Sequence, residues 1–353
     1  MIKSIQIRNF RGIKRCLIGN LEQVNILVGK NGAGKSTILE ALYLASAWVK
    51  PVDDLRAENK LDYVISRRMN RGSWDTTRKI LWHKMNTTKP IEICLSINKT
   101  TLKFILADIP KKTVWLELPF ETDLRYYSYD SREATDRLFR VTGRYSDLDK
   151  LVVEKFEGQI KFLEKLTLLD HNLSQYSREL EKKVWSILLA NRLDKELVSM
   201  IKEEYEPRAE GLTYMPLGND YTLALQLTDT TVRIDDLGDG AKNAVIYAAV
   251  LLTLKDTAIL IEEPETHQHP AGLATILNFI LKAAKQRNLQ LIITTHNIEL
   301  IKIIQKLIEK HNLSLKIFYL ERIEGIVDVR ELEKVDLQVL EKLGLDPRFL
   351  YIL

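Results

Sequence analysis

Eight consecutive residues, from Gly29 to Ser36, carry the pattern best suited to chemistry on phosphates. The run has the form G-x-x-x-x-G-K-S, in which glycines let the backbone fold tightly and turn its N–H groups toward phosphate oxygens. Lys35 would place a positive charge on the β- and γ-phosphates, and the Ser36 hydroxyl would bind Mg²⁺. The pattern predicts a nucleoside triphosphate site formed by Gly29, Lys30, Asn31, Gly32, Ala33, Gly34, Lys35, Ser36 and Thr37.

The segments on both sides of this loop fit the same prediction. Residues 24–28 are typical of a buried strand, and residues 37–45 are typical of a helix. Such a helix would direct its N-terminus at the phosphates. We expect Lys35 to face solvent without a nucleotide, so that its replacement should cost little packing.

Two carboxylates stand at the end of a second apolar segment, residues 257–261. A buried parallel strand that ends in acids places them at the ligand crevice of the sheet. Glu262 would hold Mg²⁺ through water, and Glu263 would orient the attacking water as a general base.

Two further features flank these acids in the chain. Leu237, Gly238, Asp239 and Gly240 precede an apolar helix over residues 241–254, and a flexible tetrapeptide at a helix N-terminus can bind anions. His296 ends another buried strand. A single histidine at a strand end is more often structural, but its position after both acids favours a functional role.

Composition sets limits on the class of protein. The 353 residues allow one large α/β domain or two, and the net charge of +4 does not by itself indicate nucleic acid binding. Cys16 and Cys94 lie far apart without metal-ligand spacing, which suits a reducing compartment. The first residues lack the apolar core of a signal peptide, and no apolar run reaches membrane-spanning length. We therefore expect a cytoplasmic protein without membrane contact.

In this order the motifs resemble the ATP-binding-cassette-like (ABC-like) heads of RecF, SMC and OLD-type ATPases, a group often labelled AAA15 or AAA21. Residues 5–12 are similar to the first strand of those heads. Residues 261–270 resemble their Walker B strand and D-loop, and residues 294–297 resemble their switch-histidine loop. The resemblance covers about residues 1–50 and 210–345.

The resemblance implies an α/β fold of the P-loop NTPase type, with an antiparallel β layer and a helical insertion, or lid. It also implies that two heads form a homodimer around two ATP molecules. The P-loop of one head would then face Leu237, Gly238, Asp239 and Gly240 of the other. It implies catalytic roles for Lys35, Glu263 and His296, which would touch the γ-phosphate, nucleotide contact by Arg11, and Mg²⁺ binding by Ser36 and Glu262.

Three departures from the family pattern bear on the site. Glu262 stands where most ABC-type proteins have Asp, and Gly238 stands where the transporter signature has Ser. No glutamine occurs between Gln23 and Gln159, so the usual Q-loop residue is missing. Asn70, His83 and Asn86 are candidate substitutes.

The middle of the chain predicts three parts. Residues 91–97, 101–106 and 113–118 alternate like antiparallel strands, residues 132–205 are helical in pattern, and residues 212–215, 222–227 and 231–234 return to strands around a turn at 218–220. We expect an N-terminal lobe over residues 1–125, a compact helical lid over 126–208, and a C-terminal lobe over 209–353.

A basic segment suggests one possible contact with DNA. Arg67, Arg68, Arg71 and Trp74 precede Arg78 and Lys79, which is typical of a loop that tracks phosphates and stacks on bases. Residues 125–129 are a weaker second case. The alternatives are a solvated basic loop or a surface for a protein partner.

His267 and His269 could suggest a metal site. The resemblance places the family's D-loop at these residues, so a metal site there is disfavoured.

The sequence favours a slow Mg²⁺-dependent ATPase that acts as an ATP-driven dimerisation switch in DNA maintenance or in defence against mobile elements. An ATPase that regulates a separate nuclease or effector chain is the alternative. A transporter subunit is less favoured, because the Q-loop glutamine is missing, the signature is degenerate and residues 7–11 belong to the opening that resembles RecF-type heads. A non-hydrolysing module is disfavoured by Glu262 and Glu263. The 57 residues after His296 lack a D-x-D pair, so we expect no TOPRIM nuclease domain.

Overall fold

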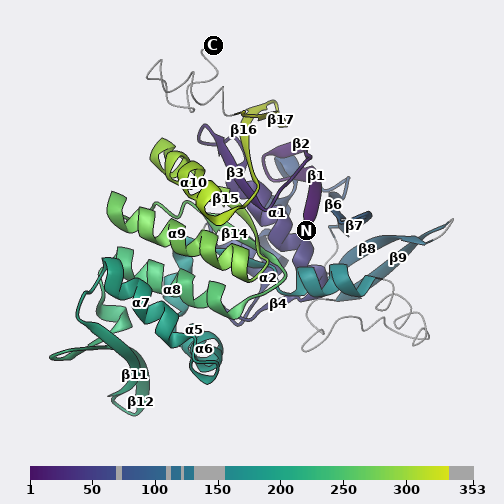
Figure 1. Cartoon of the computed structure of the whole chain (residues 1–353). Coiled ribbons are helices and arrows are strands. Elements are labelled where there is room, and N and C mark those ends of the chain that lie inside the picture. The colour runs from purple at the N-terminus through teal and green to yellow at the C-terminus, as the bar shows by residue number, and fades with distance from the viewer. Residues whose placement is uncertain (69–73, 109–112, 121–122, 131–155, 334–353) are drawn as a thin grey trace.

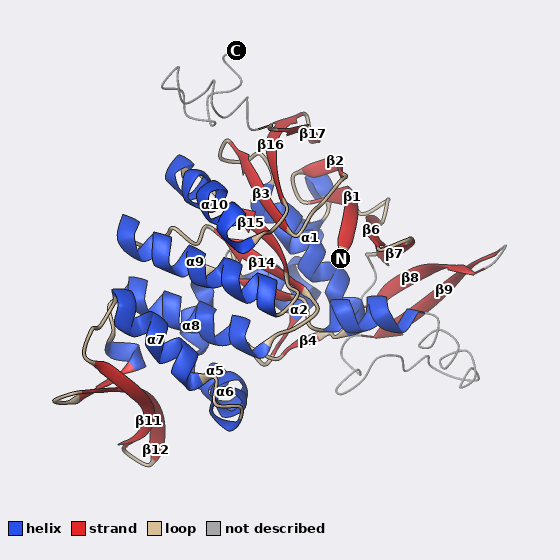
Figure 2. Ribbon diagram, in the orientation of Figure 1, coloured by secondary structure: helices blue, strands red, loops and turns tan. Residues whose placement is uncertain are grey.

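A large mixed sheet forms the centre of the molecule (Figures 1 and 2). The computed structural model describes residues 1–68, 74–108, 113–120, 123–130 and 156–333. Within these residues the sheet has twelve strands. In spatial order they are β10 (Thr167–Leu169), β14 (Ala258–Glu262), β15 (Gln290–Thr294), β3 (Val24–Gly29), β16 (Leu315–Ile323), β17 (Ile326–Glu331), β2 (Ile13–Ile18), β1 (Ile2–Phe10), β6 (Ile91–Ile97), β7 (Thr100–Leu106), β8 (Thr113–Phe120) and β9 (Asp123–Asp130).

The half of the sheet from β10 to β16 is parallel. Its central strands β3 and β15 are buried along their whole length, as continuous apolar runs require. Thr294 pairs with both Glu262 of β14 and Leu27 of β3. The loops after these three strands therefore open from one edge of the sheet, where α/β folds bind ligands.

The other half is mostly antiparallel. β17 runs parallel to β2, and β2, β1, β6, β7, β8 and β9 then form antiparallel pairs. Burial alternates along β6, because one face packs on the core. The three strands predicted over residues 91–118 are confirmed, with ends that differ by at most two residues.

Helices cover both faces of the parallel half. α1 (Lys35–Val49) and α2 (Lys60–Ser66) lie on one face, where α1 is buried nearly all round. The other face is covered by α7 (Asp194–Glu204), α8 (Asp239–Thr253), α9 (Pro270–Gln286) and α10 (Ile298–His311) (Figure 1). The predicted helices after residues 36 and 240 are thereby confirmed. In the part of the chain that the structure describes, every helix is too short or too polar to cross a lipid bilayer.

Smaller elements complete the chain. A separate three-stranded sheet of β11 (Ala209–Leu217), β12 (Asp220–Leu227) and β13 (Thr231–Arg233) confirms the predicted meander, and Gly218 has φ 61° in its first turn. The others are β4 (Val52–Asp53), β5 (Glu58–Asn59), α3 (Trp74–Thr77), η1 (Arg78–Leu81), η2 (His83–Met85), a helix over 156–164, η3 (His171–Tyr176), α5 (Ser177–Leu180), η4 (Glu181–Trp185), α6 (Ser186–Ala190) and η5 (Ile234–Asp236).

The expected helical lid differs from the structure in one respect. Its described part is mostly helical, but β10 lies within it and pairs with β14 in the main sheet. The three residues of β10, Thr-Leu-Leu, are too few to show a strand period, so the pattern missed this strand. The predicted boundary after residue 125 falls inside β9, and residues 131–155 of the lid lie outside the described residues. The three-part division stays a prediction.

Candidate functional site

The loop between β3 and α1 has the backbone that its glycines predict. Gly29, Gly32 and Gly34 have φ values of 148°, 80° and 107°, in the left-handed region where glycine is favoured. A Cβ at Gly29 would lie 2.3 Å from the carbonyl oxygen of Leu320, so no other residue fits there without movement. The loop therefore takes a wrapped form at the N-terminus of α1, as an anion site requires.

Lys35 does not face solvent, so that expectation was wrong. Lys35 is only 5% exposed, and its Nζ donates to the carbonyl oxygens of Gly29 (2.8 Å) and Lys30 (3.1 Å). Burial lowers the pKa of Lys35 to about 8, although Glu263, Glu265 and Glu262 favour its charged form. The long side chain folds back over its own loop, which a spacing pattern does not reveal.

A cavity of about 370 Å³ lies in front of this loop. It brings together the predicted loop with Glu263 and His296, which come from the ends of two other strands. The cavity is also lined by Gly12, Arg68 and Arg322. The sequence did not mark these three as nucleotide-site residues, because they come from the β1–β2 turn, the end of α2 and β16. The lining residues are Gly12, Asn31, Gly32, Gly34, Lys35, Ser36, Thr37, Arg68, Glu263, His296 and Arg322.

Glu263 and His296 both line this cavity and contact each other. His296 Nε2 lies 2.8 Å from Glu263 Oε1, and His296 Nδ1 lies 3.4 Å from Lys35 Nζ. Glu263 has φ 45°, a strained value for a residue with a side chain, and its N–H donates to the carbonyl oxygen of Thr294 (3.0 Å). The two strand ends thus bring a carboxylate, an imidazole and an ammonium into one chain of contacts.

Glu265 supports this arrangement and was not singled out from the sequence. Its Oε1 accepts from Thr295 Oγ1 (2.5 Å) and from the backbone N–H of His296 (3.1 Å). Its Oε2 is buried and has no hydrogen-bond partner among the described residues. Burial raises the pKa of Glu265. This carboxyl group fixes the backbone that carries His296. Its only signal in the sequence was its place two residues after Glu263.

A second cavity, of about 330 Å³, contains the two residues expected to hold Mg²⁺. Ser36 supplies a hydroxyl and Glu262 a carboxylate, which are the hard oxygen donors that Mg²⁺ prefers. The described residues contain no group of three or more His, Cys, Asp or Glu side chains that could hold a metal ion. Such a donor set fits an ion that is held mainly by substrate phosphates and water. The lining residues are Ser36, Arg67, Arg68, His171, Glu262, Glu263 and Thr266.

Arg67 lies inside the protein, so its predicted contact with DNA was wrong. Its side chain is 3% exposed and forms ion pairs with Glu40 (2.9 Å), with Asp170 (3.1 Å) and with Glu262. Burial opposes its charge, but these three carboxylates hold the pKa of Arg67 above its ordinary value. Because they come from three distant segments, the local composition gave no sign of this network.

The neighbouring Arg68 and the earlier Arg11 also have defined partners. Arg68 Nε pairs with Glu40 (2.7 Å), and its Nη2 donates to Thr37 Oγ1 (3.3 Å) beside the loop. Arg68 therefore belongs to the cavity rather than to an open basic surface. Arg11 was expected to contact the nucleotide, but its Nε pairs with Glu40 (2.6 Å), and among the described residues it lines neither cavity.

The remaining candidates lie elsewhere or outside the description. Asn70 and Arg71 lie outside the described residues, as does the side chain of Trp74, which begins α3. His83 and Asn86 line a different cavity, so neither replaces the Q-loop glutamine in this arrangement. η2 holds His83 against the carbonyl oxygen of Arg11 in the β1–β2 turn, and Asn86 directly follows η2.

The tetrapeptide Leu237–Gly240 stands at the start of α8 and packs on the loop after β14. Gln268 Nε2 donates to the carbonyl oxygen of Gly240 (2.8 Å), and a Cβ at Gly240 would lie 2.7 Å from the carbonyl oxygen of His267. A Cβ at Gly238 would meet no atom within 4 Å. Among the described residues, Leu237, Gly238, Asp239 and Gly240 line neither of the two cavities.

Two family models match the chain. The model described as "AAA ATPase domain" matches residues 1–120, and the model described as "AAA domain, putative AbiEii toxin, Type IV TA system" matches residues 88–302. Together these matches include both the loop at residues 29–36 and the acids at 262 and 263.

Known proteins with similar sequence or fold agree with these matches. An ATP/GTP phosphatase of Helicobacter pylori is 23% identical over 91% of this chain and 93% of its own length. The DNA double-strand break repair Rad50 ATPase of Archaeoglobus fulgidus is 34% identical over 26% of this chain, which is 12% of its own length. A solved SMC head, bound to the C-winged helix domain of ScpA, matches with a TM-score of 0.56 and 13% identity over 95% of this chain and 98% of its own.

Proposed function

Because the chain belongs to this AAA domain family and is a P-loop ATPase with the fold of SMC heads, we propose that it acts as an ATP-driven dimerisation switch. The observation that carries the proposal is the division of the site. Lys35, Glu263 and His296 line one cavity, whereas the tetrapeptide Leu237–Gly240 stands at a helix N-terminus away from it. The N-terminus of α8 can bind an anion, but among the described residues it lines neither cavity of the nucleotide site on its own head. In a dimer, a second copy would bring its own phosphate site to this helix end.

In this proposal the residues around the larger cavity bind and position ATP. The backbone N–H groups of residues 29–36 and the ammonium of Lys35 hold the phosphates. Ser36 and Glu262 would hold Mg²⁺, which, when bound, neutralises charge on the phosphates. Arg322 and Arg68 add positive charge at the same cavity.

Hydrolysis requires a water molecule that attacks the γ-phosphorus while ADP leaves. Glu263 would accept the proton of that water, and His296 would hold the carboxylate of Glu263 in place through the 2.8 Å contact. Glu265 fixes the backbone of His296 and acts as a positioning residue. The tetrapeptide Leu237–Gly240 of the second head would close the site over the γ-phosphate with its backbone N–H groups.

The proposed setting is DNA maintenance or defence against mobile elements. Similarity to a Rad50 ATPase that is named for DNA double-strand break repair supports the first, and the toxin–antitoxin description of the family supports the second. A second candidate is an ATPase that regulates a separate effector chain, because the solved SMC head of similar fold is bound to a domain of ScpA.

Complementation between two inactive variants tests the composite site. Lys35→Met should destroy phosphate binding, and Gly238→Asp should place a charge at the phosphate-facing end of α8 in open space. Each variant alone should be inactive. An equal mixture should recover about a quarter of the parent rate, because half of the dimers are mixed and each mixed dimer has one intact site. A mixture that stays as inactive as its components would contradict the proposal, provided that size-exclusion chromatography shows both variants folded.

A further inference from the structure

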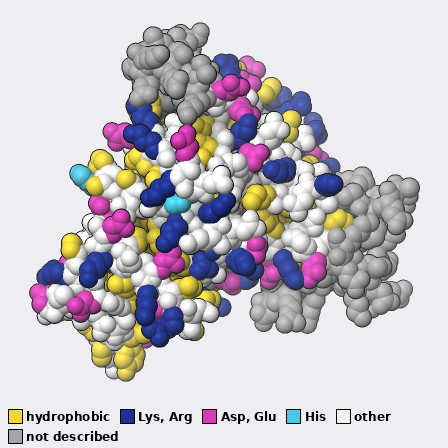
Figure 3. Space-filling model, in the orientation of Figure 1, with side chains coloured by type: hydrophobic (Ala, Val, Ile, Leu, Met, Phe, Trp, Pro, Cys, Tyr) yellow, Lys and Arg dark blue, Asp and Glu magenta, His cyan; other side chains and the backbone are white. Residues whose placement is uncertain are grey.

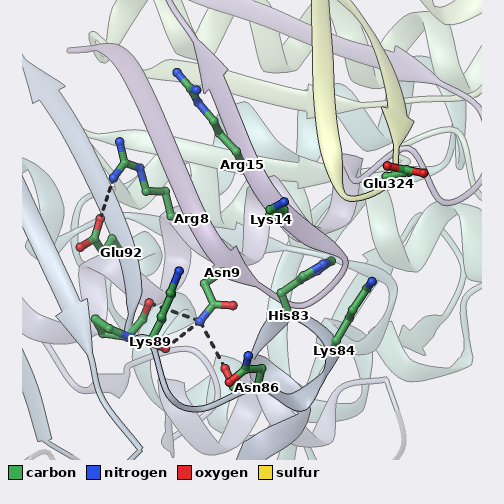
Figure 4. Close-up of a pocket in the computed structure, with 11 residues that line it drawn as sticks. Arg8, Asn9, Lys14, Arg15, His83, Lys84, Asn86, Lys89, Glu92 and Glu324 are labelled. Carbon is green, nitrogen blue, oxygen red and sulfur yellow. Dashed lines mark hydrogen bonds and ion pairs between the residues drawn. The ribbon is translucent and has the colours of Figure 1, made fainter.

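A basic cavity of about 870 Å³ lies on the antiparallel half of the molecule, apart from the two cavities of the nucleotide site. Its lining comes from β1, β2, η2, β6 and the β16–β17 turn (Figure 4). Five lining side chains are Lys or Arg and two are Glu, so the lining carries a formal charge of +3 (five minus two). The residues are Arg8, Asn9, Lys14, Arg15, His83, Lys84, Asn86, Lys89, Pro90, Glu92 and Glu324.

Most of these cations have no acidic partner. Arg8 pairs with Glu92 at 3.6 Å, and Glu92 also pairs with Lys103 at 3.3 Å. Among the described residues, no carboxylate forms an ion pair with Lys14, Arg15, Lys84 or Lys89, and all four are exposed. Figure 3 shows Lys and Arg side chains on this face over β1 and β2. Unpaired cations in a concave surface raise the local positive potential and attract polyanions.

The cavity is built on a fixed framework. Asn9 Nδ2 and Trp82 Nε1 both donate to the carbonyl oxygen of Lys89, at 2.7 and 3.0 Å. His83 Nδ1 donates to the carbonyl oxygen of Arg11 at 3.1 Å. Lys84 and Met85 have φ values of 53° and 56°. Two consecutive side chains in the left-handed region are a strained arrangement of the kind found at ligand sites.

Exposed apolar residues lie next to lining residues in the chain. Met85 follows Lys84 and is 64% exposed, and Ile323 and Ile326 flank the Glu324 turn at 63% and 51% exposed. Cations spread over several elements suit a chain of phosphates better than a single phosphate ion. Exposed aliphatic side chains beside them can contact sugars and bases. We infer that this cavity binds the phosphate backbone of a nucleic acid.

This binding does not require ATP or dimerisation, because none of its cations lines the nucleotide cavities. The two sites adjoin at two turns: Gly12 and Arg322 line the nucleotide cavity, whereas Lys14 and Glu324, two residues further along each turn, line the basic one. Nucleic acid binding at this cavity is therefore independent of the proposed switch.

The test measures fluorescence anisotropy of labelled 30-nucleotide single strands and 30-base-pair duplexes at several salt concentrations, without nucleotide. The variant replaces Lys14, Arg15, Lys84 and Lys89 with Gln. We expect its affinity to fall at least about tenfold, and the slope of log K against log salt to become shallower by about three units. Its basal ATPase rate should equal that of the parent.

A matched control removes four exposed lysines from the helical side of the molecule: Lys165, Lys183, Lys195 and Lys202, each to Gln. It should bind like the parent. Equal loss in both variants would overturn the inference, since net charge alone would then explain binding. The inference would also be overturned if inorganic tripolyphosphate competed as well as the oligonucleotide at equal phosphate concentration. A parent protein that shows no salt-dependent binding to either nucleic acid would overturn it as well.

Discussion

His296 bridges Glu263 and Lys35: its Nε2 lies 2.8 Å from Glu263 Oε1 and its Nδ1 lies 3.4 Å from Lys35 Nζ. An ammonium group can only donate hydrogen bonds, so Nδ1 acts as the acceptor and the hydrogen of the neutral ring is on Nε2. Nε2–H then donates to Glu263, which must be an unprotonated carboxylate to act as a base. One ring thus links the group that holds phosphate to the group that takes a proton.

His296→Ala should lower the rate of ATP hydrolysis and leave ATP affinity nearly unchanged. The substitution removes the hydrogen bond that orients Glu263, but the loop at residues 29–36 still binds the phosphates. We expect kcat to fall about tenfold to a hundredfold, below the full effect of losing a general base. Steady-state kinetics and calorimetry with a non-hydrolysable analogue separate the two effects. An unchanged kcat would remove His296 from the mechanism.

Lys35→Ala and Lys35→Met should both abolish nucleotide binding but differ in stability. Lys35 is buried, and burial lowers its pKa to about 8, so its ammonium is costly to keep inside the fold. Met fills the same space without a charge, whereas Ala leaves a gap. The melting temperature should therefore be higher for Met than for Ala. Calorimetry that detects ATP binding by either variant would contradict the assigned role.

Arg67→Met should destabilise the protein strongly. It removes the cation that Glu40, Asp170 and Glu262 share, and breaking a buried ion network typically costs about 3–5 kcal/mol in the free energy of unfolding. Arg68→Met is the matched control, because Arg68 also pairs with Glu40 but its side chain is 41% exposed, so we expect a loss of about 1 kcal/mol or less. Urea unfolding measures the loss in the free energy of unfolding for each variant. Equal losses would contradict the larger contribution expected from the buried network.

Lys60→Met should raise stability at neutral pH and remove part of its dependence on pH. Lys60 is buried, donates to Ser46 Oγ (2.8 Å), and has a pKa lowered by burial from 10.5 to about 8. Between these values the unfolded chain binds more protons at this group than the folded one, so its contribution makes stability rise with pH. Below about pH 8 both states are protonated and the contribution is constant.

Urea unfolding at several values from about pH 7 to about pH 9.5 tests this sign. The stability gained by Lys60→Met should be largest near neutral pH and should shrink as pH rises. Lys165→Met, at an exposed position, should show no such trend. A gain that grows with pH would contradict the account.

Much of the fold could be predicted because its signals are local. The glycines of residues 29–36, the alternation over residues 91–118 and the apolar runs before Glu262 and His296 each indicate one element and its end. Contacts between distant segments could not be predicted. Arg322 reaches the nucleotide cavity because β16 pairs with β3, and Arg67 is buried because Glu40, Asp170 and Glu262 meet around it. No single window of sequence contains either relationship.

The most direct test of the proposed switch is Glu263→Gln. The amide keeps the shape of the carboxylate and leaves Lys35 and Ser36 to bind Mg·ATP, but it cannot accept a proton. Hydrolysis should therefore slow by about 10²–10⁴-fold. ATP would then stay bound across two heads, and mass action should shift monomers to dimers.

Adding Gly238→Asp should return the protein to monomers. Gly238 is chosen over Gly240 because a Cβ there meets no atom within 4 Å, whereas a Cβ at Gly240 would lie 2.7 Å from the carbonyl oxygen of His267. Light scattering with and without Mg·ATP is the measurement. The account predicts an ATP-dependent dimer for Glu263→Gln and a monomer for the double variant. A Glu263→Gln protein that binds ATP and stays monomeric would contradict it.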